Sequence, residues 1–135
     1  MKKIVILTCP KSEDVCTGGG CFHAFNHRTQ RFAAYGEEEL EMEAFMKCSG
    51  CGHFPGKDKG LDEKIDYILR IHPDAVHVGI CCCHDGRDRT LCPEVEAICH
   101  TFKERDISIV FGTHSIFEGP ESLREIESKT DREGV

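Results

Sequence analysis

The chain has 135 residues, which is the usual size of one domain, and a chain of this length can bury a stable core without disulfide bonds. Its 24 Asp and Glu residues outnumber its 17 Lys and Arg residues and give a formal net charge of −7. Because nucleic acids and anionic membranes both bind best to a basic surface, the negative net charge disfavours them as main partners. We expect a single domain over residues 1–135, in which residues 130–135 form a frayed tail.

The ten cysteines are more than a core of this size needs for stability. No charged and then apolar leader opens the sequence, and no apolar run reaches the length that spans a membrane, so we expect a cytoplasmic protein. In a reducing compartment, many cysteines indicate metal ligation or thiol chemistry rather than a disulfide framework. The cysteines are therefore the first candidates for functional residues.

The first part of the chain predicts a strand, a loop and a helix. Residues 2–8 contain a continuous apolar run with β-branched residues, which is typical of a buried strand, and this strand ends at Cys9. A loop with Cys16 and three glycines follows. Beyond it, apolar residues at helical spacing predict one helix that ends near Gly36 and carries three aromatic side chains on one face: Phe22, Phe25 and Phe32.

The rest of the chain continues this alternation. Apolar residues alternate over residues 40–46 and predict a second strand that leads to Cys48, and residues 57–72 have the spacing of an amphipathic helix. Later segments predict a strand over 75–80 that ends in three cysteines, a helix that starts at Cys92-Pro93, a strand over 107–111 and a short polar helix within 120–129.

Strands that alternate with helices predict an α/β fold. We expect a single-domain three-layer sandwich with a mostly parallel sheet of about four strands and helices on both faces. The carboxyl ends of parallel strands open on one edge of the sheet, where ligands bind. Each predicted strand end carries a thiol or an imidazole: Cys9, Cys48 with Cys51, Cys81, and His114.

The C-x-x-C pair Cys48 and Cys51 is the centre of the site expected at this edge. One ion can take both sulfurs, and Gly50 and Gly52 let the turn fold back around them. Soft thiolates select zinc over magnesium or calcium. The predicted metal ligands are Cys9, Cys16, Cys48, Cys51, Cys81, Cys92 and His114, with Cys9, Cys48, Cys51 and Cys81 as the leading set.

The other cysteines are assigned by their place in the predicted elements. Cys99 lies on the apolar face of a helix and is expected in the core. Cys92 precedes a helix, whose dipole favours its thiolate. Side chains alternate along a strand, so at most two of Cys81, Cys82 and Cys83 face the same way. Cys81 is preferred, although the choice among the three stays open.

Several of these motifs together resemble the CGGC domain family, a family of small proteins regarded as metal-binding domains. Ser49 stands where the family's name-giving motif has glycine, and serine can occupy that turn position while both thiols remain. The resemblance covers about residues 3–114 and implies a zinc-like site built from Cys and His, but no particular reaction. The residues that carry it are Cys9, Ser12 to Cys16, Cys48 to Cys51, His77 to Cys81, Cys92-Pro93 and Gly112 to His114.

Two other kinds of site use the same thiols. Cys48 and Cys51 could cycle between dithiol and disulfide, although thioredoxin-like pairs lie at a helix N-terminus and residues 52–56 separate this pair from its helix. An iron–sulfur cluster is less favoured, because no closely spaced run of three or four cysteine ligands is present.

The segment from Cys83 to Thr90 fits the C-x-x-G-x-x-R-[ST] pattern of cysteine-dependent phosphatases, with Cys83 and Arg89 in the key positions. Against this function, the next helix starts several residues after the arginine, and two aspartates in the loop would repel a bound phosphate. No small-molecule substrate can be named from the sequence.

Overall fold

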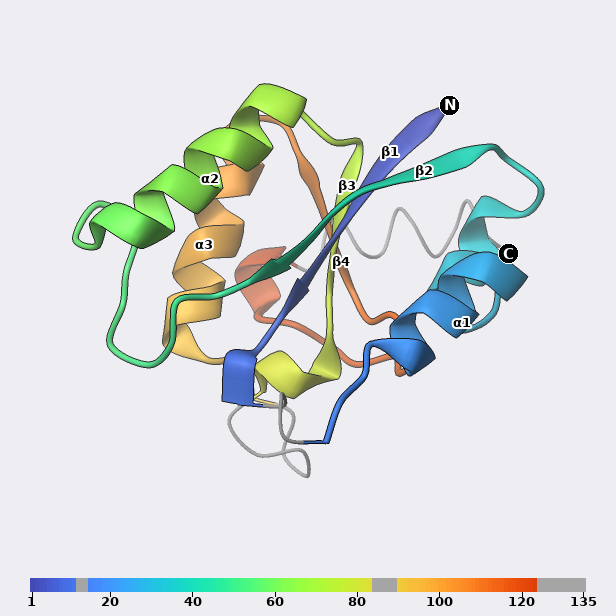
Figure 1. Cartoon of the computed structure of the whole chain (residues 1–135), viewed down its shortest axis with the longest axis horizontal. Coiled ribbons are helices and arrows are strands. Elements are labelled where there is room, and N and C mark those ends of the chain that lie inside the picture. The colour runs from blue at the N-terminus through green and yellow to red at the C-terminus, as the bar shows by residue number, and fades with distance from the viewer. Residues whose placement is uncertain (12–14, 84–89, 124–135) are drawn as a thin grey trace.

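The computed structural model describes residues 1–11, 15–83 and 90–123 of the chain (Figure 1). Within these residues, four strands form one sheet in the order β2-β1-β3-β4, and every neighbouring pair is parallel. The predicted α/β fold with a parallel sheet is confirmed. The strands are β1 (Lys2–Thr8), β2 (Leu40–Lys47), β3 (Ala75–Val78) and β4 (Ser108–Phe111).

Helices cover both faces of the sheet (Figure 1). Ile4 and Ile6 of β1 pack with α1 and η2 on one face, whereas Val5 and Leu7 pack with α2 and α3 on the other. All four side chains are fully buried, which is why β1 is a continuous apolar run. The helical segments named here are α1 (Gly19–His27), the 3-10 helix η2 (Gln30–Tyr35), α2 (Lys59–Ile71) and α3 (Pro93–Lys103).

The single helix predicted to end near Gly36 is wrong, because the chain turns between α1 and η2. Arg28 closes α1 in the left-handed region at φ 55°, and its guanidinium donates hydrogen bonds to the carbonyl oxygens of Gly36 (3.1 Å) and Glu38 (2.7 Å). The turn redirects the chain so that Phe32 is fully buried, while Phe22 stays 38% exposed. Tertiary packing of Phe32 therefore overrides the local helical spacing.

The third strand is shorter than predicted. It ends at Val78, and the 3-10 helix η3 (Ile80–Cys82) follows, so the three consecutive cysteines do not continue a strand. The Gly79 amide donates to the Leu7 carbonyl oxygen over 2.9 Å, which holds the start of this turn against β1. As a result Cys82 is fully buried instead of facing the edge.

The end of the described chain is a 3-10 helix, η4 (Glu121–Leu123). It falls at the start of the polar helix expected within 120–129, and the rest of that segment and the tail lie outside the described residues. Within residues 1–11, 15–83 and 90–123, no helix combines the length and the apolar character that crossing a bilayer requires.

The order of the strands reverses between β1 and β3, because the chain proceeds from β1 outward to β2 and then returns to the other side for β3. In sheets of this kind the loops that follow the two central strands diverge and leave a crevice at the carboxyl edge. The segment after β1 begins with Cys9, which is therefore at the place where this topology forms sites.

Candidate functional site

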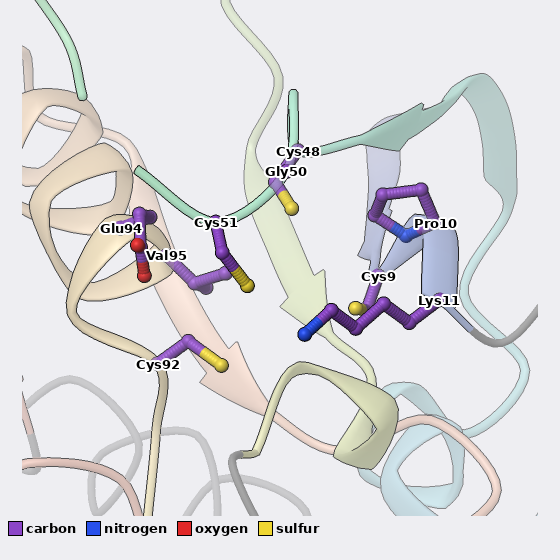
Figure 2. Close-up of a pocket in the computed structure, with 9 residues that line it drawn as sticks. All are labelled: Cys9, Pro10, Lys11, Cys48, Gly50, Cys51, Cys92, Glu94 and Val95. Carbon is purple, nitrogen blue, oxygen red and sulfur yellow. The ribbon is translucent and has the colours of Figure 1, made fainter. Parts of the chain in front are cut away.

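Four of the predicted ligands line one cavity at the carboxyl edge of the sheet (Figure 2). Cys9 follows β1, Cys48 follows β2, Cys51 lies in the next turn, and Cys92 is the residue before α3. The cavity has a volume of about 20 Å³, which is room for about one water-sized group. We call it the thiol pocket; its other lining residues are Pro10, Lys11, Gly50, Glu94 and Val95.

Backbone hydrogen bonds bring three separate segments to the thiol pocket. The Cys48 amide donates to the Thr8 carbonyl oxygen over 3.1 Å, so the chain after β2 stays beside the end of β1. Gly50 then turns the chain with φ +102°. The Gly52 amide donates to the Glu94 carboxylate over 2.6 Å, which ties this turn to the first turn of α3. The C-x-x-C turn is thereby held between β1 and Cys92.

The sulfurs of the thiol pocket differ in exposure and affect each other's ionisation. Cys9 and Cys48 are buried, Cys92 is half-buried and Cys51 is exposed. Burial raises the pKa of Cys48, and negative charge on Cys9 and Cys51 raises it further. Burial and the same two neighbours also raise the pKa of Cys92. Ionising several of these thiols together therefore favours a compensating cation.

Lys11 places one positive charge at the thiol pocket. Its side chain extends toward the sulfurs of Cys9 and Cys51 (Figure 2). A hydrogen bond to Cys51, together with the charge of that thiol, raises the pKa of Lys11. The ammonium group is therefore the cationic neighbour of Cys51 at the exposed side of the pocket.

The four sulfurs lie around the same cavity, but they are not arranged around a single metal position. In the part of the chain that the structure describes, no three or more Cys, His, Asp or Glu side chains are grouped closely enough to hold a metal ion. The four thiols of the pocket nevertheless form a donor set that suits a soft cation. Ligation would require them to move inward together.

Cys81 lies next to the thiol pocket but is not among its lining residues. The Cys9 amide donates to the Cys81 sulfur over 3.3 Å, so Cys81 contacts the backbone of a pocket residue. Sequence reasoning preferred Cys81 to Cys92, because it treated Cys81 as a strand-end residue. In the structure Cys81 belongs to η3, whereas Cys92 lines the pocket.

Cys16 and His114 are brought to a different place, at the start of α1. Cys16 is exposed, and His114 Nδ1 lies 3.7 Å from the sulfur of Cys21. None of these three residues lines the thiol pocket. The seven predicted ligands thus divide between two neighbouring parts of the carboxyl edge.

Sequence reasoning missed Lys11 and Glu94, which both line the thiol pocket. Lys11 follows Cys9-Pro10, and nothing in the sequence around it distinguishes it from an ordinary loop lysine. Glu94 is an acidic residue in the first turn of a helix, which is common for reasons unrelated to any site. Only its hydrogen bond to the C-x-x-C turn distinguishes it.

Four cysteines outside the thiol pocket belong to the hydrophobic core: Cys21, Cys82, Cys83 and Cys99. Cys99 is fully buried on α3, as predicted. Cys83, the nucleophile of the phosphatase pattern, is 8% exposed and packs in the larger core cluster. Arg89 and the rest of that loop, residues 84–89, lie outside the described residues.

The fold and the pocket together define an α/β domain with a cysteine-rich carboxyl edge. The family model of the CGGC domain matches residues 3–114, which includes all four strands and all four thiols of the pocket. The chain therefore belongs to the CGGC domain family. Comparisons with curated proteins and with solved structures found no match.

Proposed function

We propose that this chain binds one zinc ion in the thiol pocket through Cys9, Cys48, Cys51 and Cys92. The observation that carries the proposal is the convergence of these four thiols, from three segments of the chain, on a cavity of single-ion size. Zinc prefers four tetrahedral ligands and binds readily to sets of four cysteines. The ten cysteines all lie in the described residues and are thiols rather than halves of disulfides, so those of the pocket are available as ligands.

Cys81 has a supporting role in this proposal. Its sulfur accepts the Cys9 amide, so it orients the backbone of a ligand without occupying the cavity. Groups that hold metal ligands in place typically change metal affinity about 10-fold to 100-fold when they are removed. Cys92 takes the place of Cys81 in the set of four ligands, because it lines the cavity directly.

Bound zinc would neutralise the thiolates and, where a ligand position is left to water, would act as a Lewis acid. Cys51 and Lys11 lie at the exposed side of the pocket, so access from solvent is from this side. The buried Cys9 and Cys48 form its inner wall. A complete set of four thiolates gives a structural site, whereas exchange of Cys51 for water gives a site that can polarise a substrate.

Metal analysis of protein purified without oxygen tests the proposal. We expect about one zinc per chain, and a large loss of zinc in Cys48→Ser and in Cys92→Ser. Substoichiometric zinc in the wild type, without iron or sulfide, would rule out a resident metal. Iron with acid-labile sulfide and visible absorbance would instead identify an iron–sulfur protein.

A second candidate function is thiol redox chemistry by Cys48 and Cys51, which the contact between Lys11 and the exposed Cys51 supports. The ammonium group lies beside Cys51, and cysteines next to a cation are typical of disulfide exchange. The pair does not lie at a helix N-terminus, since α2 begins only at Lys59. Metal-free wild-type protein whose Cys48 and Cys51 join in a disulfide under mild oxidation would favour this function over zinc binding.

A further inference from the structure

Two histidines face each other on the exposed side of α1. His23 and His27 are four residues apart, and residues at this spacing are neighbours on one face of a helix. Their ring centroids are 4.3 Å apart, and the ring planes are inclined to each other by 37°. Cys21 and Ala24 are the buried residues of this helix, whereas both histidines are exposed. The helix therefore presents two adjacent imidazoles to solvent.

These two rings differ from the other histidines that the structure describes. Within residues 1–11, 15–83 and 90–123, no group forms a hydrogen bond with His23 or His27. Every other described histidine has at least one hydrogen-bond partner. These are His53, His72, His77, His100 and His114. In the pair on α1, each neutral ring therefore keeps a nitrogen lone pair that a cation can use.

The distance between the rings suits two ligands of one metal ion. Metal–nitrogen bonds of about 2.0–2.1 Å, at a ligand angle between about 90° and about 109°, place the two ring centroids about 4.5–5 Å apart. The observed 4.3 Å is close to this range, so a small rotation of the exposed side chains is sufficient. Histidines at positions i and i+4 of a helix also hold the zinc ion in many metalloproteases.

The charges around the pair also favour a cation. His27 lies in the last turn of α1, at the negative end of the helix dipole. Arg28 is the next residue, but its guanidinium donates hydrogen bonds to the carbonyl oxygens of Gly36 and Glu38, which hold its charge there. The chain as a whole has a formal net charge of −7. A divalent ion at the two rings is therefore attracted by its surroundings.

We propose that His23 and His27 together bind one divalent ion of the class that imidazole prefers, which includes Zn²⁺, Ni²⁺ and Cu²⁺. The chain supplies two ligands and water fills the remaining positions, so the ion exchanges readily with solvent. Neither histidine lines the thiol pocket, and the donors here are imidazoles rather than thiolates. The site is therefore separate from the proposed zinc site and does not require zinc to be bound there.

Ni²⁺ is the probe for this site, because added zinc would also enter the thiol pocket. Protein purified without oxygen, with the metal that it carries, is titrated with Ni²⁺ while backbone amide signals are recorded by NMR. Paramagnetic Ni²⁺ broadens the signals of nearby residues, so we expect selective broadening in α1. In His23→Gln and in His27→Gln, which each leave a single imidazole, the affinity for Ni²⁺ should be at least about tenfold weaker.

His100→Gln is the matched control, because it removes an imidazole that is bonded to Ser122 rather than placed beside another histidine. This variant should bind Ni²⁺ as tightly as the wild type. His23 and His27 are both exposed, so their replacement should leave the fold intact, which circular dichroism checks. Equal affinity for Ni²⁺ in the wild type, His23→Gln and His27→Gln would mean that the rings do not act together and would overturn the proposal.

Absorbance and zinc content separate this site from the thiol pocket. Cys48→Ser should keep the wild-type affinity of α1 for Ni²⁺, and His23→Gln should keep the wild-type amount of zinc, since the two sites share no residue. Intense thiolate-to-nickel absorption without broadening in α1 would place the probe at cysteines and overturn the proposal. Wild-type protein that lacks zinc but binds Ni²⁺ through both histidines would support this site and refute only the zinc proposal.

Discussion

Cys48 and Cys99 are both buried, yet their surroundings differ. Cys48 is 6% exposed and lines a cavity with three other thiols, whereas Cys99 is fully enclosed by the core between α3 and the sheet. Burial raises the pKa of both, but negative charge on Cys9 and Cys51 contributes only at Cys48. The neighbours of a cysteine, more than its burial, therefore distinguish a candidate ligand from a core residue.

We predict that Cys48→Ser loses most bound zinc and that Cys99→Ser retains it. Serine at position 99 buries a hydroxyl group, so this variant should be less stable by about 1–3 kcal/mol while its metal content is unchanged. Zinc per chain is measured after desalting, alongside urea unfolding. Equal zinc loss in the two variants would mean that Cys48 acts through stability alone.

His77 lies on β3 with both ring nitrogens bonded. Its Nδ1 donates to the Gly112 carbonyl oxygen over 2.9 Å, and the Tyr35 hydroxyl donates to Nε2 over 2.7 Å. Its ring stacks on Phe32 with the centroids 4.3 Å apart. The Gly112 carbonyl oxygen can only accept, so Nδ1 carries a proton, and in the neutral ring Nε2 accepts from the Tyr35 hydroxyl.

We predict that protonation of His77 destabilises the protein in mild acid. Burial, with Arg31 nearby, lowers the pKa of His77 from 6.5 to about 4. Between these values the unfolded chain binds the proton and the folded chain does not, so the free energy of unfolding falls as pH drops from about 6.5 to about 4. His77→Gln should flatten the curve of stability against pH over this interval. A curve as steep as that of the wild type would assign the effect to other groups.

At the scale of elements, the site depends on how the C-x-x-C turn is fixed to α3. Glu94 provides this attachment through the Gly52 amide, whereas Glu96 lies in the same first turn without lining the thiol pocket. We predict that Glu94→Ala lowers zinc affinity about 10-fold, because Cys51 loses its fixed distance from Cys92.

Glu96→Ala is the matched control for this change, since it removes the same charge from the same end of α3. Competition with a chromogenic chelator measures both affinities. Equal losses in the two variants would indicate an effect of helix charge rather than of the attachment.

The end of β4 depends on a glycine. Gly112 has φ +122°, and a Cβ atom there would lie 2.5 Å from the Ser115 carbonyl oxygen and 2.8 Å from Arg31 Cγ. We predict that Gly112→Ala destabilises the protein by at least about 2 kcal/mol. Gly36→Ala is the control for backbone strain alone, because Gly36 also has positive φ (+58°) but has no atom within 4 Å of its Cβ position. Denaturant unfolding should show the smaller loss for Gly36→Ala.

At the scale of the whole molecule, the thiol pocket connects the ends of β1 and β2 to α3. Zinc bound there would favour the folded state by about 3–4 kcal/mol when its concentration is 100 to 1,000 times the dissociation constant. The core is large and extends well beyond the few pocket residues that belong to it, so the metal-free chain should remain folded.

We predict that a chelator lowers the melting temperature by about 10 °C without unfolding the protein at room temperature. Calorimetry and circular dichroism measure the two effects, and Cys48→Ser should not respond to the chelator. An unchanged wild-type melting temperature after zinc removal would contradict a site that connects these elements. Complete unfolding on zinc removal would show that the core is not sufficient.

Much of this architecture was predictable because its signals are local. The apolar run of β1 follows from burial of both of its faces. The helical spacing of apolar residues in α2 and α3 follows from burial of one face of each helix. The parallel sheet follows from their alternation, and its topology gathers the strand ends at one edge. The core position of Cys99 was predictable from helical spacing in the same way.

The break after α1 and the early end of β3 were not predictable, because distant contacts cause both. Arg28 bonds carbonyl groups beyond η2, and Gly79 bonds the Leu7 carbonyl oxygen on β1. These contacts decide that Phe22 and Phe32 separate and that Cys81 leaves the strand. They have no signature in the residues nearby.

By itself the sequence determined the fold class, the CGGC family and the concentration of thiols at the carboxyl edge. Only the tertiary structure decided how those residues divide, with Cys9, Cys48, Cys51 and Cys92 in one pocket and His114 beside Cys21 at α1. The physical reason is that strands alternating with helices form a parallel sheet, which fixes the edge that a strand-end residue reaches. The hydrogen bonds between loops, which the order of residues does not encode locally, fix its neighbours there.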